Sequence, residues 1–97
     1  IEGLAAFGMS VIQGWGMTET SPLAALARLK PAEDALPAAE RLRYQTSQGL
    51  PCPLVRLRIA DDAGQALPWD GVRMGEVQVR GPWITGAYHG GEGADKF

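Results

Sequence analysis

The sequence predicts an α/β (α+β) chain in which a helix end and a buried strand lead into a ligand loop, followed by one helix and a small antiparallel, barrel-like sheet. Three observations support this class. A glycine closes a helical turn before a short apolar strand near the start, good helix formers follow Pro37, and two later segments alternate between apolar and polar residues. With 97 residues, of which 45% are hydrophobic, the chain has room for one modest core.

The beginning of the chain is predicted to form a helix end, a strand and a loop. Leu4–Phe7 resembles a last helical turn, and Gly8 is free to adopt the left-handed conformation of a C-cap. A short buried strand is predicted over Ser10–Gln13, and it runs into the glycine-flanked loop Gly14-Trp15-Gly16. Because α/β sheets bind ligands beyond the carboxyl ends of their strands, we expect a site in this loop.

The middle of the chain contains one open assignment and one predicted helix. Ser21-Pro22 is a favourable helix start, but Leu23–Leu29 is equally compatible with an extended segment that leaves the sheet. Pro31 is expected to end this segment. Good helix formers predict a helix from Leu36-Pro37 to Gln48, with Gly49 as its stop.

The second half is predicted to be β-rich. Between Leu54 and Ala60, apolar residues alternate with arginines, which is the period of a half-buried strand. Asp61–Gly64 is predicted to be a turn. Gly75–Gly81 alternates like the first strand, and Pro82 ends it because proline has no backbone N–H for a sheet. Two such strands predict a small antiparallel sheet or part of a barrel.

Composition and charge argue against several classes of function. The net charge is −2 and the nine basic residues are scattered, so no face gathers positive charge for a nucleic acid. Cys52 is the single cysteine, which excludes an internal disulfide and favours a reducing, cytoplasmic location. No apolar stretch approaches the ~20 residues needed to span a bilayer. With Cys52 and His89 as the only Cys and His, zinc sites and histidine-dependent triads are unsupported.

The residues best suited to chemistry lie in the loop after the first predicted strand. Trp15 offers a flat ring for stacking on a base, Thr18 a hydroxyl donor for an anionic oxygen, and Glu19 a hard oxygen ligand. Gly16 lets the backbone come close to a ligand. A carboxylate beside a polyphosphate is repulsive without a cation between them, so Thr18 and Glu19 acting on one ligand imply Mg²⁺.

The residues alone leave a second interpretation of this loop open. Thr18, Thr20 and Ser21 are common turn and cap residues, Glu19 is compatible with a solvated surface, and Trp15 with a place in the core. The chain also has no Walker phosphate loop, so a bound nucleotide would need its phosphate-cradling loop elsewhere.

Two motifs resemble those of the AMP-forming acyl-CoA synthetases of the adenylate-forming superfamily. Gly14–Pro22 resembles the aromatic-Gly-x-Thr-Glu motif, and Gly75–Tyr88 resembles the Gly-Glu-strand-Gly…Gly-Tyr motif. Gly49–Asp61 is similar to the long- and medium-chain fatty acyl-CoA synthetases. Because family members are several-fold longer, the resemblance implies an internal fragment of the large N-terminal AMP-binding domain. Residues 1–48 would be its α/β part with the nucleotide motif, and residues 49–97 a β-rich subdomain.

The resemblance also implies residue roles. Trp15, Gly16 and Thr18 match nucleotide-binding positions, with Trp15 on the adenine and Thr18 on the phosphate. Glu19 matches the carboxylate linked to Mg²⁺, and Thr18 and Glu19 are the expected catalytic residues. Gly14 and Met17 match substrate-binding positions near the acyl pocket.

The implied reaction uses ATP, Mg²⁺ and coenzyme A. A fatty carboxylate attacks the α-phosphate of ATP to form an acyl-adenylate and pyrophosphate, and the thiol of coenzyme A then displaces AMP. The fragment lacks the lysine-containing phosphate loop, the Thr-Gly-Asp that would hold the ribose, and the domain with the catalytic lysine. We therefore expect it to be inactive by itself and the parent, for which a homodimer is one expectation, to be the enzyme.

The second motif is mainly structural in the family. Gly81 and Gly86 are expected to permit tight turns, with Tyr88 packed nearby. Ala87 departs from the family because it replaces the usual glycine before the tyrosine, which would strain a turn that needs a positive φ. Many members also have tyrosine where Trp15 stands, a change that stacking tolerates.

Two alternatives to the fatty acyl-CoA ligase stay open. One is an adenylating enzyme that delivers its acyl group to a different acceptor, such as a carrier-protein thiol. The other is a non-catalytic, β-rich interaction module in which the Gly-Trp-Gly turn is structural.

Overall fold

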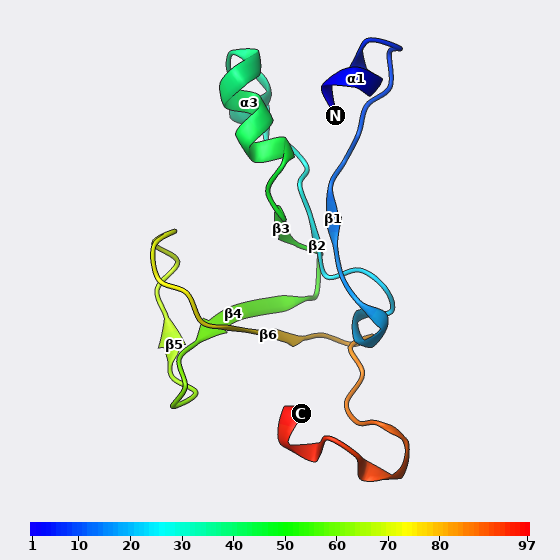
Figure 1. The fold of residues 1–97 in the computed structure, drawn as a ribbon, viewed down its shortest axis with the longest axis vertical. Helices are drawn as coiled ribbons and strands as arrows, with labels where there is room; N and C mark the ends of the chain where they lie inside the picture. Colours follow the sequence, from blue (N-terminus) through cyan, green and yellow to red (C-terminus); the bar gives the residue numbers. More distant parts are fainter.

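A computed structural model describes all 97 residues as an open, elongated molecule (Figure 1). Its radius of gyration is 16.2 Å, whereas a compact chain of this length would have about 12.5 Å. Six residues are buried, four of them alanines: Thr20, Ala24, Ala25, Ala27, Val55 and Ala60. The buried core is therefore small, because the apolar faces of the strands have no second layer to pack against.

The first helix ends as predicted. Helix α1 (Glu2–Ala5) is followed by Gly8 in the left-handed conformation, with φ +72°. The Gly8 N–H donates to the Ala5 carbonyl at 2.9 Å and the Met9 N–H to the Leu4 carbonyl at 3.2 Å. These two bonds satisfy helix-end carbonyls in the manner of a Schellman cap.

The strand predicted over Ser10–Gln13 is misplaced. Strand β1 is Gly14–Trp15, inside the segment expected to be loop, and Ile12 is 52% exposed. The cause is the length of the partner strand β2 (Ala25–Leu26), because pairing ends where the Ala27 N–H donates to the Gln13 carbonyl at 2.8 Å. Residues before Gln13 have no neighbouring strand.

The first sheet has the strand order β1-β2-β3, and both pairs are antiparallel. The segment left open between helix and strand is thus extended, and β3 (Leu50–Pro51) continues the sheet. A Cβ atom on Gly49, which has φ +78°, would lie 1.9 Å from the Leu26 carbonyl oxygen. Gly49 therefore allows β3 to lie close to β2. It does not act as the expected helix stop.

Helix α2 (Pro31–Asp34) begins at the proline that was expected only to end the preceding segment. Proline suits the first helical position because its fixed φ is helical and its missing N–H would have no partner there. The Lys30 N–H donates to Glu33 Oε2 at 2.8 Å and closes the first turn.

Helix α3 (Ala38–Gln45) confirms the predicted helix but ends before Gln48. Hydroxyl groups of the next two residues form hydrogen bonds back into the helix, from Thr46 to the Leu42 carbonyl at 2.9 Å and from Ser47 to the Tyr44 carbonyl at 2.7 Å. These side chains end the helix by competing for its carbonyl groups.

The second sheet has the order β5-β4-β6, with β4 (Arg56–Ala60), β5 (Ala66–Leu67) and β6 (Glu76–Arg80) all antiparallel. The two predicted strands are thereby confirmed as direct partners, with Arg56 opposite Arg80 and Ala60 opposite Glu76. The sequence did not indicate β5, which lies in their long connection.

Figure 1 shows how these parts are arranged. The first sheet and the helices form one arm, and the second sheet extends across its base. A short 3₁₀ helix, η1 (Thr18–Thr20), lies below β1 near the end of β6. Beyond β6 the chain forms a hook that contains η2 (His89–Gly91) and η3 (Ala94–Lys96). None of the helices has the length and apolar character needed to cross a membrane.

Candidate nucleotide site

The loop after β1 is closed by the buried side chain of Thr20, which is 0% exposed. Its Oγ1 accepts a hydrogen bond from the Met17 N–H at 2.7 Å and lies within donating distance of two carbonyl oxygens, those of Met17 at 2.9 Å and Pro22 at 2.8 Å. Thr20 therefore fixes the path of the loop. From the sequence, Thr20 was identified only as a common turn residue. Its position directly after the predicted site residues Thr18 and Glu19 was the signal that it also belongs to the site.

Gly16 lets the two ends of the loop touch. A Cβ atom at Gly16 would lie 1.8 Å from the Pro22 carbonyl oxygen and 2.9 Å from the Leu23 Cα atom, which no side chain allows. The close approach that this glycine permits is thus to the returning backbone of its own loop.

The predicted site residues of this loop retain exposed surface. Trp15 is half-buried, and its carbonyl accepts a hydrogen bond from the Ala24 N–H at 2.9 Å. Met17 is 49% exposed, and Gly14 and Thr18 are also exposed. The indole ring and the Thr18 hydroxyl are therefore held by paired backbone while parts of them stay open to a ligand.

Glu19 joins this loop to the second motif. The Tyr88 hydroxyl donates to Glu19 Oε1, and the Thr85 N–H donates to the Glu19 carbonyl oxygen at 2.8 Å. Close by, the Trp83 indole N–H donates to the Leu23 carbonyl oxygen at 3.1 Å. Hydrogen bonds that span 60 and 69 residues in sequence thus join the two motifs into one unit.

The contact with Tyr88 also sets the protonation of the acid. The phenol hydrogen bond, aided by the backbone N–H of Glu19 itself, holds the pKa of the Glu19 carboxyl below its usual value. The same hydrogen bond is the main reason why the pKa of the Tyr88 phenol is raised. At neutral pH the pair is therefore a carboxylate that accepts and a neutral phenol that donates.

The second motif does not need the glycine that Ala87 replaces. Ala87 has no positive φ, since Ser21 and Leu54 are the non-glycine residues with that conformation. Gly81 and Gly86 are not left-handed either, and no neighbouring atom lies within 4 Å of a Cβ placed on Gly86. The expected strain at Ala87 is thus absent, and the expected turn function of Gly86 is not observed.

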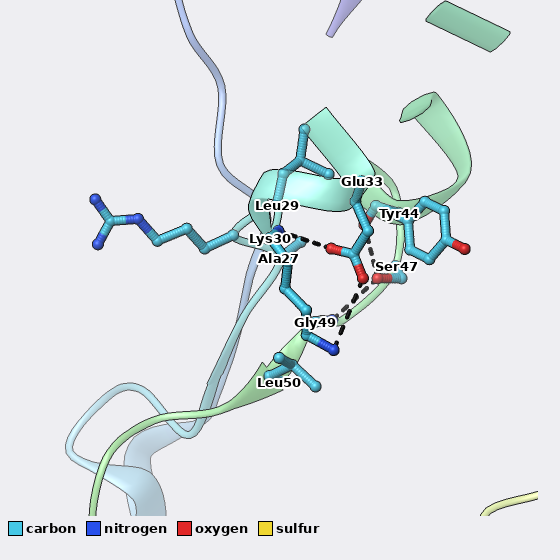
Figure 2. A pocket seen from close by; sticks show the side chains of 9 residues that line it. Ala27, Leu29, Lys30, Glu33, Tyr44, Ser47, Gly49 and Leu50 are labelled. Atoms are coloured by element: carbon cyan, nitrogen blue, oxygen red, sulfur yellow. Dashed lines mark hydrogen bonds and ion pairs between the residues drawn. The ribbon is translucent and has the colours of Figure 1, made fainter. Parts of the chain in front are cut away.

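A separate pocket of about 250 Å³ lies between the helices and the first sheet (Figure 2). It contains none of the predicted site residues. The polar groups in it pair with one another: Lys30 Nζ lies 3.8 Å from Glu33 Oε1, and the Gly49 N–H donates to Ser47 Oγ at 3.2 Å. This pocket is a seam between helix and sheet in which Lys30, Glu33, Ser47 and Gly49 already have partners.

The loop could bind Mg²⁺ through Glu19 together with a nucleotide. No group of three or more His, Cys, Asp or Glu side chains comes together, so the chain forms no cage of its own for a metal. Glu19 supplies one ionised carboxylate, and Tyr88 occupies one of its two oxygens. Mg²⁺ commonly uses one or two carboxylates together with substrate phosphates and water, so Glu19 fits such a site when a nucleotide is present.

The chain belongs to the AMP-binding enzyme family, whose family model matches residues 3–89. It is 48% identical over 89 residues to the long-chain-fatty-acid–CoA ligase of Thermus thermophilus, which covers 92% of this chain and 16% of that protein. It is 38% identical over 82 residues to the 3-methylmercaptopropionyl-CoA ligase of Ruegeria lacuscaerulensis, covering 84% and 15%. The chain thus spans about a sixth of the length of these relatives.

A solved structure shares the arrangement of the chain. The crystal structure of a long-chain-fatty-acid–CoA ligase from Archaeoglobus fulgidus superposes with a TM-score of 0.56 at 31% identity. The match covers 75% of this chain and 12% of that one. The predicted mixed α/β class is thereby confirmed.

Proposed function

We propose that the protein containing this chain is an ATP-dependent, AMP-forming ligase that joins a fatty acid to coenzyme A. The observation that carries the proposal is the 48% identity over 89 residues to a long-chain-fatty-acid–CoA ligase. We also propose that residues 1–97 are an internal segment of its large AMP-binding domain, divided near residue 48. A cytoplasmic location and a homodimeric state complete the proposal, and fractionation and sedimentation of the full-length protein test them.

In this proposal the loop after β1 binds the nucleotide. Trp15 stacks on adenine, Gly16 and Thr20 hold the loop in shape, and Thr18 donates its hydroxyl hydrogen bond to a phosphate oxygen. Gly14 and Met17 face the acyl group. The half-buried indole and the exposed hydroxyl support these roles because both are accessible yet anchored through hydrogen-bonded backbone.

Glu19 holds Mg²⁺ in this proposal, and the ion would supply charge stabilisation at the phosphates. As negative charge develops during attack of the fatty carboxylate on the α-phosphate, the Thr18 donor stabilises it in place. The pKa of Glu19, held below its usual value by Tyr88, keeps the acid ionised for this task at neutral pH.

The test is a two-stage assay of the full-length protein. We expect pyrophosphate exchange into ATP that depends on a fatty acid, and AMP release that depends on coenzyme A. A series of short-, medium- and long-chain acids then identifies the substrate class, with the long-chain acids expected to be best. Absence of any acid-dependent exchange would contradict the proposal.

An enzyme with another acyl acceptor gives a different result in the same assay. It would show acid-dependent exchange but no release of AMP by coenzyme A. The names of the three similar proteins reported above all specify a CoA ligase, which favours coenzyme A. A non-catalytic module would show neither activity.

A further inference from the structure

The Tyr88 side chain touches the proposed metal-binding acid from a distant part of the sequence. Its hydroxyl donates to Glu19 Oε1 across 69 residues. An ionised carboxylate has two oxygens and only accepts hydrogen bonds, so a donor on one oxygen fixes the rotation of the group and leaves the second oxygen available. The hydrogen bond from Tyr88 thereby restricts the positions that Glu19 Oε2 can take.

Both partners of this contact are held in place, Glu19 through its backbone and Tyr88 through its ring. On one side, the Glu19 carbonyl accepts the Thr85 N–H at 2.8 Å, so the turn that carries the acid is tied to the segment that carries the phenol. On the other side, the Tyr88 ring meets Phe97 edge to face, with ring centroids 5.1 Å apart at 81°. Gly93 lies against the same ring, because a Cβ placed on it would be 3.3 Å from Tyr88 Cδ2.

We infer that Tyr88 is a positioning residue for Mg²⁺-dependent nucleotide binding: its hydroxyl orients the Glu19 carboxylate so that Oε2 faces the cation on the ATP phosphates. The inference rests on the proposed function of Glu19 and assigns to the second motif a role beyond packing. Hydrogen-bond partners of this kind determine the orientation of metal ligands, and their removal commonly lowers metal affinity about 10- to 100-fold.

The test uses Mn²⁺ as a spectroscopic probe for Mg²⁺ in the full-length protein with ATP. We expect Tyr88→Phe to weaken Mn²⁺ binding about 10- to 100-fold by electron paramagnetic resonance titration. AMP affinity in EDTA should not change, because AMP binding without a metal does not use Glu19. The matched control is Tyr44→Phe on α3, a tyrosine 45% exposed, for which Mn²⁺ affinity should equal that of the natural protein.

A double-mutant cycle separates positioning from general packing. Tyr88→Phe retains the ring that meets Phe97, so we expect an unchanged thermal midpoint. In a Glu19→Gln background, Tyr88→Phe should change Mn²⁺ affinity less than about twofold, because a residue that acts through Glu19 has nothing left to position. Equal losses in both backgrounds would overturn the inference, and so would unchanged Mn²⁺ affinity in Tyr88→Phe alone.

The outcome for the natural protein distinguishes the two proposals. If it binds Mn²⁺ and ATP together but Tyr88→Phe is indistinguishable from it, the positioning role fails and the proposed function stands. If the natural protein binds no Mn²⁺ with ATP, the proposed function and the inference both fail.

Discussion

The helical arm, formed by α2 and α3, and the loop after β1 differ in the sequence range of the hydrogen bonds that hold them. In the helical arm, side-chain hydrogen bonds span at most seven residues, as from Arg41 to the Asp34 carbonyl, from Ser47 to the Tyr44 carbonyl and from Thr46 to the Leu42 carbonyl. In the loop, Thr20 pairs locally with Met17 and Pro22, but Glu19 pairs with Tyr88 across 69 residues. The helical arm is therefore specified by its own sequence, whereas the environment of Glu19 forms only when a distant segment lies beside the loop.

This difference separates two kinds of substitution. A change in the arm removes local contacts and leaves the loop untouched. A change at Glu19 or at its distant partners disturbs contacts between the two motifs that no neighbour in sequence can replace. Paired substitutions, one in each region, therefore test the comparison directly.

The largest effect is expected for Glu19→Gln. Loss of the carboxylate charge should reduce adenylate formation by the full-length protein about 10²–10³-fold, the cost typical of removing one group that stabilises transition-state charge. Fatty-acid-dependent pyrophosphate exchange at limiting Mg²⁺ measures it. Glu33→Gln in the arm is the control, with exchange expected at the natural rate. Unchanged exchange in Glu19→Gln would contradict the proposed metal-binding role of Glu19.

Next in size is Gly16→Ala. The added Cβ would overlap the Pro22 carbonyl oxygen at 1.8 Å, so the loop must open. We expect destabilisation near the upper end of the about 1–3 kcal/mol typical of overpacking, together with weaker AMP binding. Gly86→Ala is matched to it, because its Cβ meets no atom within 4 Å. Similar unfolding midpoints for the two variants would show that the loop closes differently.

A smaller effect is expected for Thr20→Val. The variant fills the same volume but leaves the part-buried Met17 N–H without its acceptor, which should cost about 1–2 kcal/mol in the free energy of unfolding. Thr46→Val in the arm is the control and should stay within about 0.5 kcal/mol, because its hydroxyl is exposed. Chemical denaturation of the full-length protein compares the two variants. Equal losses in the free energy of unfolding would contradict the difference expected between the loop and the helical arm.

The smallest effect concerns a local turn in the second sheet. Asp70 Oδ1 accepts the N–H groups of Arg73 and Val72, each at 2.9 Å, and these bonds lower the pKa of the carboxyl from its usual 3.8. A lowered native pKa means that the turn contributes stability above pH 3.8 and loses it as the pH falls through the native value. Asp70→Ala should therefore lower the thermal midpoint at pH 7 and less so below pH 3.8. If the difference in thermal midpoint between the natural protein and Asp70→Ala became larger in acid, the prediction would be contradicted.

The elements that could be predicted from the sequence are those with local signals. Helix α3 follows from a run of good helix formers, and the pairing of β4 with β6 from two alternating segments. The Asp61–Gly64 turn is also confirmed, because Asp61 Oδ1 accepts the Gln65 N–H at 2.8 Å. The Ser10–Gln13 strand was misplaced because strand ends depend on where a partner strand stops.

The site could be predicted only in part. The residue types of the loop identified Trp15, Thr18 and Glu19 as candidates, and their roles stay predictions. The residues that give the loop its shape were not found, since a buried threonine has the same residue type as an exposed turn threonine, and the contact of Tyr88 with Glu19 is set by packing between distant segments. Hydrophobic periodicity carries no information about which distant residue becomes a neighbour.

The bond between Glu19 and Tyr88 also has a consequence for synthesis of the protein. Ribosomes add about 5–20 residues per second, so the 69 residues between the two side chains take roughly 3 to 14 s to make. During that interval the acid has been translated and its tyrosine has not. The contact between the two motifs therefore cannot form in a nascent chain until the second motif has been translated.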